Sequence, residues 1–386
     1  MQNFTHHIPT EILFGQGQIE HLTEVLDRYG KTVLLTYGGG SIKSIGLYDD
    51  VKARLAAGGF RVVECGGIDP NPRIDTVRRG AALAREHHAD VVLAVGGGST
   101  IDCSKAICTG ALYEGDLWEM VMHPETIRGA LPLVDILTLA ATGSEFDPFS
   151  VISNPETRQK IGSPLTYPAV SICDPTYTYT VSAYQTAAGS ADIMSHVMEV
   201  YFSDVADSEV SEGLCEMLLK TVIRNLPIAL REPDNYTARA NLMYASSLAC
   251  CGMPSYGKDV YAWSCHGMEH ELSAYYDITH GVGLAILTPR WMEHILSPKT
   301  VGRFVRFAKN VFGLDGGDDL ALARAGIAAL SEFFRGCGIP MTLGEVGIDE
   351  AEFGNMARDA VLFGDLANAY VPLTEEDVTA IFRACL

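Results

Sequence analysis

Residues 90–105 read DVVLAVGGGSTIDCSK, a short apolar run that ends in three glycines and a serine. The run predicts a buried β-strand, and the residues after the glycines predict a helix. A turn without Cβ atoms lets the backbone approach a phosphate group, and the helix offers free N–H groups and the positive end of its dipole. In this interpretation Ser99 caps the helix and Asp102 stands in its first turn.

A second strand with the same ending, KTVLLTYGGGS, occupies residues 31–41. Neither turn matches the GxGxxG or GxxxxGKS pattern of known phosphate-binding loops. For each turn alone, an ordinary tight connection between strand and helix is the alternative. Two such turns in one region favour nucleotide binding.

The rest of the first half continues to alternate strands and helices. Residues 60–64 and 133–139 are typical of strands, and residues 47–57 and 73–88 are typical of helices. This alternation predicts a parallel sheet with helices on both faces. After about residue 180, strand-like runs nearly vanish and long helical patterns follow. We therefore predict a Rossmann-like α/β domain over residues 1–180 and an all-α domain over residues 181–386.

The charge balance excludes some classes of partner. The chain has 386 residues, with 28 Lys and Arg against 48 Asp and Glu, for a formal net charge of −20. Such a field disfavours nucleic acid and anionic membrane. The ten cysteines include no CxxC pair, so we expect buried free thiols in a reducing compartment. Without a signal peptide or an apolar run of membrane-spanning length, a cytoplasmic protein is expected.

The helical half carries possible metal ligands. Residues 261–281, YAWSCHGMEHELSAYYDITHG, contain His266 and His270 one helical turn apart, followed by His280. Upstream, Asp192 and His196 form a second pair spaced by four residues. Imidazole nitrogens and a carboxylate oxygen are ligands that Zn²⁺ and Fe²⁺ accept. Histidines that only stabilise the fold are the alternative.

A third motif, TLAATGSE, covers residues 138–145. Its small hydroxyl residues follow a predicted strand, where they can hydrogen-bond a ribose or a carboxamide. A structural turn in which Ser144 caps a helix is the alternative.

In their order and spacing, GGGSTIDCSKA, TLAATGSE, Asp192-x₃-His196 and His266-x₃-His270-x₉-His280-Gly281 resemble the iron-containing (group III) alcohol dehydrogenases. The resemblance covers essentially the whole chain. ILFGQGQIEHL, GGIDPNP and DPTYTYT are most similar to the butanol dehydrogenase-like, broad-range aldehyde reductase branch. The family resemblance implies a nicotinamide-binding α/β domain, an all-α metal-binding domain, an active site in the cleft between them, and a homodimer.

The resemblance also implies roles for individual residues. The family's metal ligands correspond to Asp192, His196, His266 and His280, whereas His270 is the candidate for relaying a proton near the nicotinamide. The pyrophosphate would lie on the second glycine turn. The residues expected to bind the dinucleotide are Gly38, Gly39, Gly40, Ser41, Asn71, Gly96, Gly97, Gly98, Ser99, Asp102, Thr138, Thr142, Lys160 and Tyr177.

Two departures from the family pattern stand out. NAD-preferring members carry an Asp after the first strand, whereas this chain has the turn of residues 38–41 followed by Lys43. Without a carboxylate to repel a 2′-phosphate, and with Ser41 and Lys43 as donors, we predict that NADP(H) is preferred over NAD(H). The second departure is Asp147-Pro148, where relatives often have Asn, and its consequence is left open.

The predicted function is hydride transfer between NADP(H) and a primary alcohol and aldehyde pair such as butanol and butanal, with one Fe²⁺ or Zn²⁺ ion. A glycerol dehydrogenase-like polyol oxidoreductase of the same superfold is one alternative. A dehydroquinate synthase is disfavoured because the phosphate-binding Arg and Lys residues of that enzyme are not found. A metal- or nucleotide-binding protein without enzymatic activity is the third.

Overall fold

The computed structural model describes residues 1–204 and 207–386, which divide into two compact units. The α/β unit comprises His7–Val181 and Asp234–Ser247, and the helical unit comprises Met1–His6, Ser182–Pro233 and Leu248–Leu386. Residues 234–247 therefore lie with the α/β unit, although chain order had assigned them to the helical domain. The reason is packing, because Met243 enters the core of the α/β unit and Ser247 Oγ donates to Glu145 Oε1 at 2.6 Å.

The α/β unit is built on a six-stranded parallel sheet with the order β1-β8-β5-β4-β2-β3. Its strands are β1 (Glu11–Phe14), β2 (Thr32–Tyr37), β3 (Arg61–Cys65), β4 (Val91–Gly96), β5 (Leu133–Leu137) and β8 (Val170–Cys173). A separate antiparallel hairpin consists of β6 (Phe149–Asn154) and β7 (Gln159–Pro164). The predicted Rossmann-like parallel sheet is confirmed.

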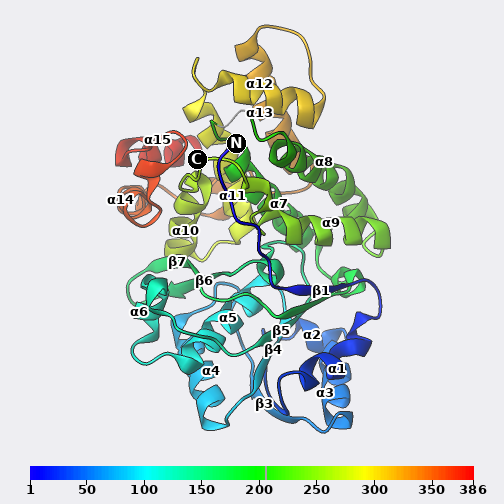
Figure 1. Cartoon of the computed structure of the whole chain (residues 1–386). Helices are drawn as coiled ribbons and strands as arrows, with labels where there is room; N and C mark the ends of the chain where they lie inside the picture. The colour runs from blue at the N-terminus through cyan, green and yellow to red at the C-terminus, as the bar shows by residue number, and fades with distance from the viewer. Residues whose placement is uncertain (205–206) are drawn as a thin grey trace. The chain divides into compact units, whose positions relative to one another are not determined.

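Side chains of the strands alternate between two apolar cores, one on each face of the sheet. Val33 and Leu35 face a core shared with α1 (Leu22–Asp27), α2 (Ser41–Ser44) and α3 (Leu47–Ala57). Leu34 and Val92 face the opposite core, which holds α4 (Ile74–Glu86), α5 (Gly98–Leu112), α6 (Leu117–Met122) and part of α9 (Tyr236–Ala249). Figure 1 shows α4, α5 and α6 on one side of the strands and α1, α2 and α3 on the other.

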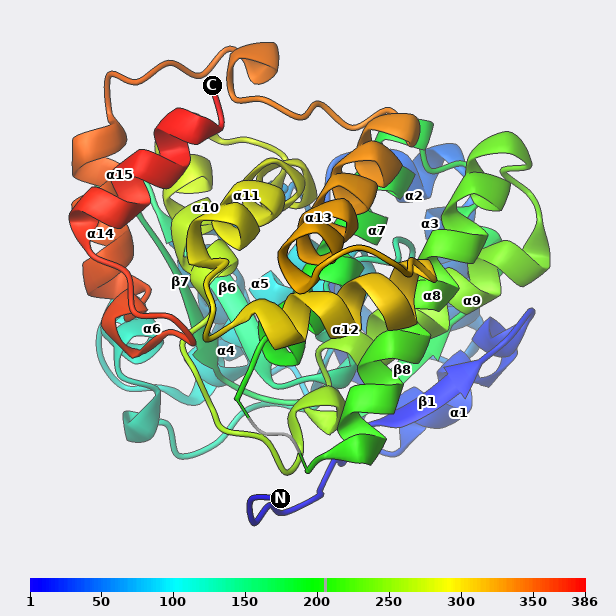
Figure 2. The same cartoon turned by 90° about the horizontal axis from the view of Figure 1, so that it is seen from above.

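The helical unit is arranged around α7 (Ala183–Tyr201), whose residues are buried on all sides from Thr186 to Glu199. The other helices are α8 (Glu209–Arg231), α10 (Ser264–Tyr276), α11 (His280–Ile295), α12 (Val301–Phe312), α13 (Asp319–Gly336), α14 (Phe353–Phe363) and α15 (Glu375–Ala384). In Figure 2 the α14–α15 pair lies on one side of α10 and α11, and the α12–α13 pair on the other. The predicted all-α character is confirmed.

Short 3₁₀ helices complete the two units. They are η1 (Gln18–His21), η2 (Pro124–Thr126), η3 (Ser144–Phe146), η4 (Pro175–Thr178), η5 (Met253–Ser255), η6 (Gly344–Val346) and η7 (Leu366–Asn368).

Two helices of the helical unit continue through a proline. Pro227 lies inside α8 and Pro289 lies inside α11. A proline removes one backbone hydrogen bond from a helix. Buried residues on both sides of each proline outweigh that loss, so the helices are not interrupted.

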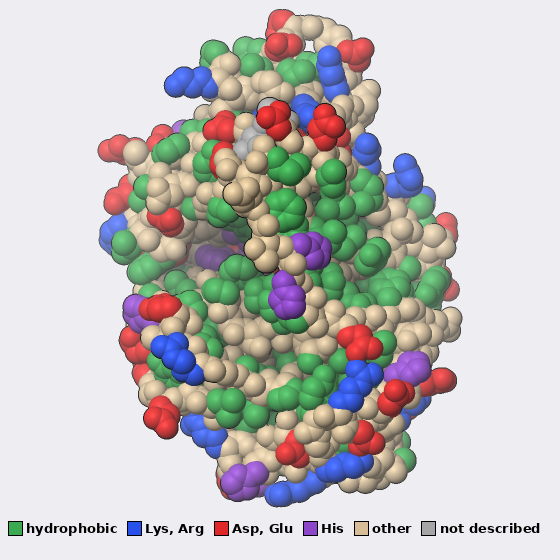
Figure 3. All heavy atoms as spheres, viewed as in Figure 1, with side chains coloured by type: hydrophobic (Ala, Val, Ile, Leu, Met, Phe, Trp, Pro, Cys, Tyr) green, Lys and Arg blue, Asp and Glu red, His purple; other side chains and the backbone are tan. Residues whose placement is uncertain are grey.

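All ten cysteines are free thiols and eight of them are buried, as the composition predicted. On the face that Figure 3 shows, acidic and basic side chains lie scattered among polar and apolar ones. Among the described residues, no helix combines the length and the apolar character that crossing a membrane requires.

Candidate active site

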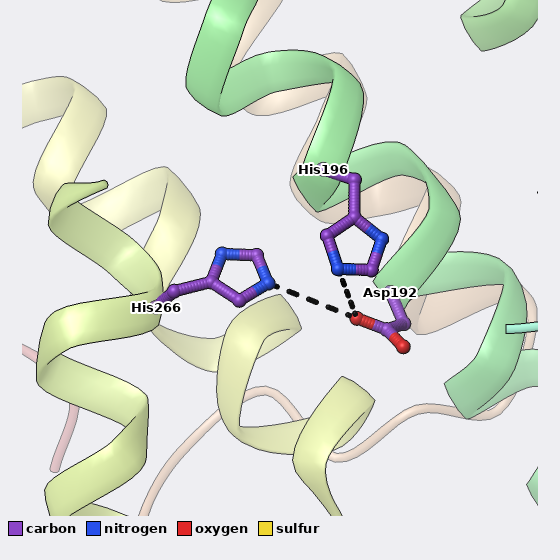
Figure 4. A group of neighbouring side chains, drawn as sticks. All are labelled: Asp192, His196 and His266. Atoms are coloured by element: carbon purple, nitrogen blue, oxygen red, sulfur yellow. Dashed lines mark ion pairs between the residues drawn. The ribbon is translucent and has the colours of Figure 1, made fainter. Parts of the chain in front are cut away.

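Three of the four side chains predicted as metal ligands, the histidines, converge on a carboxylate oxygen of the fourth, Asp192, in the helical unit. Asp192 Oδ1 lies 3.6 Å from His196 Nε2, 3.9 Å from His266 Nε2 and 3.6 Å from His280 Nε2. Figure 4 shows the His196 and His266 rings directed at this carboxylate. The separations are too long for good hydrogen bonds, which cluster near ~2.9 Å. Ligand atoms held at about 2.0–2.2 Å from a tetrahedral ion would be about 3.3–3.6 Å apart, close to the separations seen.

Three helices bring these side chains together. Asp192 and His196 stand one turn apart on α7, His266 lies in the first turn of α10, and His280 is the first residue of α11. The neighbour of His280 is Gly281, where a Cβ atom would lie only 1.9 Å from the backbone oxygen of Ala188 on α7. Glycine at this position therefore lets α11 approach α7 closely enough for His280 to reach Asp192.

The chemistry of this donor set fits a divalent ion. The Asp192 side chain is 3% exposed, and those of His196 and His266 are 7% and 8% exposed. His266 Nε2 is buried without a hydrogen-bond partner among the described residues. Burial, reinforced by the neighbouring imidazoles, lowers the pKa of His196 and favours the neutral ring that binds metals. Neutral imidazoles and a carboxylate suit Zn²⁺ and Fe²⁺.

His270 lies beside this cluster. Its ring centroid is 6.4 Å from that of His266 and 5.9 Å from that of His280. A ligand atom of His270 also lies within 4.8 Å of ligand atoms on Glu269 and His280. His266 and His270 of α10 therefore have different neighbours. His266 Nε2 faces Asp192, whereas His270 lies next to Glu269 and His280.

Two carboxylates that sequence reasoning missed contact the Nδ1 atoms of two of the predicted ligands, His266 and His280. Glu199 Oε1 lies 3.1 Å from His266 Nδ1, and Glu269 Oε2 contacts His280 Nδ1. A signal was present in the sequence, because Glu199 follows His196 by three residues on α7 and Glu269 follows His266 by three residues on α10. Helical neighbours at that spacing share a face.

The α/β unit carries the predicted nucleotide-binding residues at the carboxyl ends of adjacent strands. β3 follows β2 in the chain and pairs with one edge of β2, whereas β4 comes next and pairs with its other edge. The direction in which strands are added therefore reverses between β2 and β4. Open parallel sheets bind ligands outside the carboxyl ends of the strands at such a switch point. The turn of residues 38–41 directly follows β2, and the turn of residues 96–99 begins at the last residue of β4 and leads into α5.

The second glycine turn packs tightly against the loop after β5. A Cβ atom on Gly98 would lie 2.2 Å from Thr142 Oγ1, so glycine is required there. Ser99 does not cap α5 as predicted. The N-cap is Gly97 without a side-chain cap, and Ser99 Oγ instead donates to the Pro70 backbone oxygen, next to Asn71. The two glycine turns, the loop of residues 66–72 and the loop after β5 therefore lie together.

Asp102 connects α5 to two other segments. It is buried, its Oδ1 accepts a hydrogen bond from Ser144 Oγ at 2.5 Å, and its Oδ2 accepts one from the Val151 backbone N–H at 3.0 Å. Burial raises the pKa of Asp102, although the nearby Lys105 and Lys160 ammonium groups oppose that rise. The alternative that Ser144 caps a helix is wrong, because no side chain caps η3 and Ser144 instead donates to Asp102.

The remaining residues predicted to bind the cofactor lie in the same unit. Thr138 follows β5 and is buried, and Lys160 is a buried residue of β7. Tyr177 belongs to η4 and packs on the core that contains α3, where burial raises its pKa to about 12. Asp147, the unexplained departure from the family pattern, forms a buried ion pair with Lys105 at 3.1 Å.

Glu145 makes the stability of this region depend on pH. Burial raises its pKa from 4.5 to about 7, although Ser247 donates a hydrogen bond to it. The folded state therefore retains a proton that the unfolded state releases, so stability falls as pH rises from about 4.5 to about 7. The unfolding free energy of the wild type should fall by up to ~3 kcal/mol between pH 5 and pH 8 because of this group, whereas that of Glu145→Gln should not show this fall. Urea denaturation of both proteins at both pH values measures the difference. The same pH dependence in the wild type and the variant would contradict the prediction.

A parallel sheet with glycine turns at its switch point and a buried cluster of imidazoles around a carboxylate are together the features expected of a metal-dependent protein that binds a nucleotide. The model of iron-containing alcohol dehydrogenase matches residues 9–175, and that of the C-terminal region of the Fe-containing alcohol dehydrogenase family matches residues 186–386. The chain belongs to the iron-containing alcohol dehydrogenase family.

Individual relatives agree. The chain is 50% identical to NADH-dependent butanol dehydrogenase A of Clostridium acetobutylicum over 387 residues, which cover 99% of both chains. It is 37% identical to NADPH-dependent aldehyde reductase YqhD of Escherichia coli over 354 residues, 90% of both. The crystal structure of NADH-dependent butanol dehydrogenase A from Thermotoga maritima matches with a TM-score of 0.95 and 38% identity, covering 100% of this chain and 99% of that one. The protein is therefore an oxidoreductase of the alcohol dehydrogenase and aldehyde reductase class, and the non-enzymatic alternative is set aside.

Proposed function

We propose that this protein interconverts small aldehydes and primary alcohols of the butanal and butanol type, with NADP(H) and one divalent ion, Fe²⁺ or Zn²⁺. The observation that carries the proposal is the convergence of three imidazole Nε2 atoms on Asp192 Oδ1. The similarity to a butanol dehydrogenase of Clostridium acetobutylicum and an aldehyde reductase of Escherichia coli supports the substrate class.

Asp192, His196, His266 and His280 would hold the ion. When bound, the ion supplies Lewis-acid polarisation of the carbonyl, and the nicotinamide supplies the hydride. His270 donates a proton to the product oxygen during aldehyde reduction and accepts it in the reverse direction. An imidazole suits this task because its pKa lies near neutrality.

The α/β unit would bind the dinucleotide at the switch point of its sheet. The first N–H groups of α5 are available to a pyrophosphate, since no side chain caps this helix at Gly97. Asn71 would contact the adenosine half. Thr138, Thr142 and Lys160 would contact the nicotinamide ribose, with Tyr177 as a further contact.

Coenzyme preference depends on the turn after β2. This turn contains no carboxylate, and its last residue, Ser41, is exposed, as is the nearby Lys43. Lys43 Nζ lies 5.0 Å from the ring centroid of Tyr37 and 4.8 Å from that of Tyr48. We propose that Lys43 pairs with the 2′-phosphate of NADPH. The names of the relatives cited above include both coenzymes, so a direct comparison decides the question.

Lys43→Ala is expected to lower kcat/KM for NADPH about tenfold and to leave NADH little changed, because a hydrogen bond to a charged group contributes about 1.5–3 kcal/mol. Initial rates with both coenzymes on one aldehyde measure this effect. Lys52→Ala is the matched control, since Lys52 belongs to the same region but pairs with Glu64 at 2.6 Å. A wild-type preference for NADH above tenfold would contradict the proposal.

The substrate class is tested by the loss of absorbance at 340 nm when NADPH is mixed with butanal, other aldehydes or dihydroxyacetone. Preference for straight-chain aldehydes is expected. Preference for dihydroxyacetone, with glycerol in the reverse direction, would favour the polyol oxidoreductase instead. A homodimer located in the cytoplasm is part of the proposal, and light scattering tests the oligomeric state.

A further inference from the structure

We propose that Glu199 and Glu269 are positioning residues that fix the imidazoles of His266 and His280 as metal ligands. Each carboxylate would accept a hydrogen bond from Nδ1 of one ring, which leaves the lone pair of Nε2 directed at the ion. The inference rests on the proposed metal site and adds residues that do not touch the metal or the substrate.

Glu199 joins α7 to the start of α10. Its Oε1 accepts a hydrogen bond from the His266 backbone N–H at 2.8 Å and lies 3.1 Å from His266 Nδ1. The N-cap of α10, Trp263, provides no side-chain cap, so this carboxylate satisfies one of the free N–H groups of the first turn. A negative charge at a helix N-terminus is also favourable. Glu199 therefore holds both the backbone and the ring of His266.

Glu269 joins α10 to the start of α11. Its side chain is fully buried, its Oε2 contacts His280 Nδ1, and its Oε1 accepts a hydrogen bond from Ser273 Oγ at 2.5 Å. Both carboxylate oxygens thus have partners. Ser273 holds one oxygen of the carboxylate in place, and the other oxygen faces the imidazole.

The protonation of the rings follows from these contacts. An ionised carboxylate only accepts hydrogen bonds, so Nδ1 of each ring carries the proton and Nε2 is the free donor atom toward the ion. Carboxylate partners of this kind orient metal-binding histidines and raise their basicity. His196 differs, because its Nδ1 is buried without a hydrogen-bond partner among the described residues and its ring stacks on that of His266 at 4.8 Å. In the part of the chain that the structure describes, a glutamate carboxylate therefore contacts the rings of His266 and His280 but not that of His196.

The experiment compares metal binding in four variants with that of the wild type. Glu199→Ala and Glu269→Ala remove the hydrogen-bond acceptor, whereas Glu199→Gln and Glu269→Gln keep an acceptor oxygen and remove its charge. Glu216→Gln is the matched control, because Glu216 is a buried acceptor of the same unit that bonds to Tyr201, Arg306 and Asn310. The Kd for Zn²⁺ is measured by chelator competition, and the visible spectrum is recorded for the Co²⁺ form. Circular dichroism confirms that each variant is folded at the temperature used.

The alanine variants are expected to raise the Kd for Zn²⁺ about 10–100-fold and to shift the Co²⁺ spectrum, with smaller changes in the glutamine variants. Glu216→Gln should stay within about twofold of the wild type. Wild-type Kd values and spectra in folded alanine variants would overturn the inference while leaving the metal site intact. Two ions per wild-type chain, with one lost in Glu269→Ala, would also overturn it, because Glu269 would then be a ligand. A wild-type chain that binds no ion would instead contradict the proposed function.

Discussion

His280→Ala is expected to lose the bound metal and to lower kcat/KM for aldehyde reduction about a thousandfold or more, while the fold persists. The size of the effect follows from the several kcal/mol that Lewis-acid polarisation contributes to the transition state. The fold should survive because the His280 side chain is 23% exposed, more than the other ligands, so its removal opens little buried space. Metal analysis after gel filtration, together with initial rates, measures both effects.

The control for this prediction is His270→Ala, which removes a neighbouring imidazole on the same side of the site. We expect full metal content and a kcat about a hundredfold lower, in the range of a lost general acid. Loss of the metal in His270→Ala, with retention in His280→Ala, would show that the ligand assignment is wrong.

Lys258→Ala is expected to destabilise the helical unit by about 3–5 kcal/mol, the range for breaking a buried ion pair by removing one partner. Lys258 Nζ lies 2.8 Å from Glu212 Oε1, and both side chains are at most 1% exposed. The same ammonium donates to the Val200 backbone oxygen at 3.0 Å. Its removal leaves Glu212 Oε1 buried without its ammonium partner, while Glu212 Oε2 still faces Arg303 and, at 3.5 Å, Arg306. Urea denaturation followed by circular dichroism measures the change in unfolding free energy.

Lys309→Ala is the matched control for this second prediction. Lys309 pairs with Asp315 at 3.8 Å, and the two side chains are 50% and 90% exposed. An exposed pair contributes about 0–1 kcal/mol, so this variant should unfold almost as the wild type does. Equal stabilities of Lys258→Ala and Lys309→Ala would contradict the importance assigned to the buried pair.

Much of the fold could be predicted because local patterns and tertiary structure agree. β2 and β4 are continuous apolar runs with glycine turns, and the alternation with α3 and α4 allows only a parallel sheet. β1 and β8 were missed because each has four residues and too little pattern to recognise. Residues 234–247 were assigned to the wrong unit because a helical pattern does not tell which core its buried face joins.

The metal site shows the same limit at the level of side chains. The equal spacing of His266 and His270 on α10 gave no reason to separate them, and only the family resemblance proposed Asp192, His196, His266 and His280 as ligands and His270 as a proton relay. The separation of His266 and His270 depends on where α7 and α11 pack, which the helical period does not contain. Glu199 and Glu269 were missed because glutamates are common on helices, and only the packed structure shows that these two are buried against imidazoles.

The most direct test of the central claim is a titration of metal-free protein with Fe²⁺ or Zn²⁺ while NADPH-dependent reduction of butanal is followed at 340 nm. We predict that chelated protein is nearly inactive and that the rate rises in proportion to added ion until one equivalent per chain is bound. Asp192→Ala should show no such rise. A metal-free protein that reduces butanal at the full rate, or a reconstituted protein that stays inactive with both ions and both coenzymes, would contradict the account.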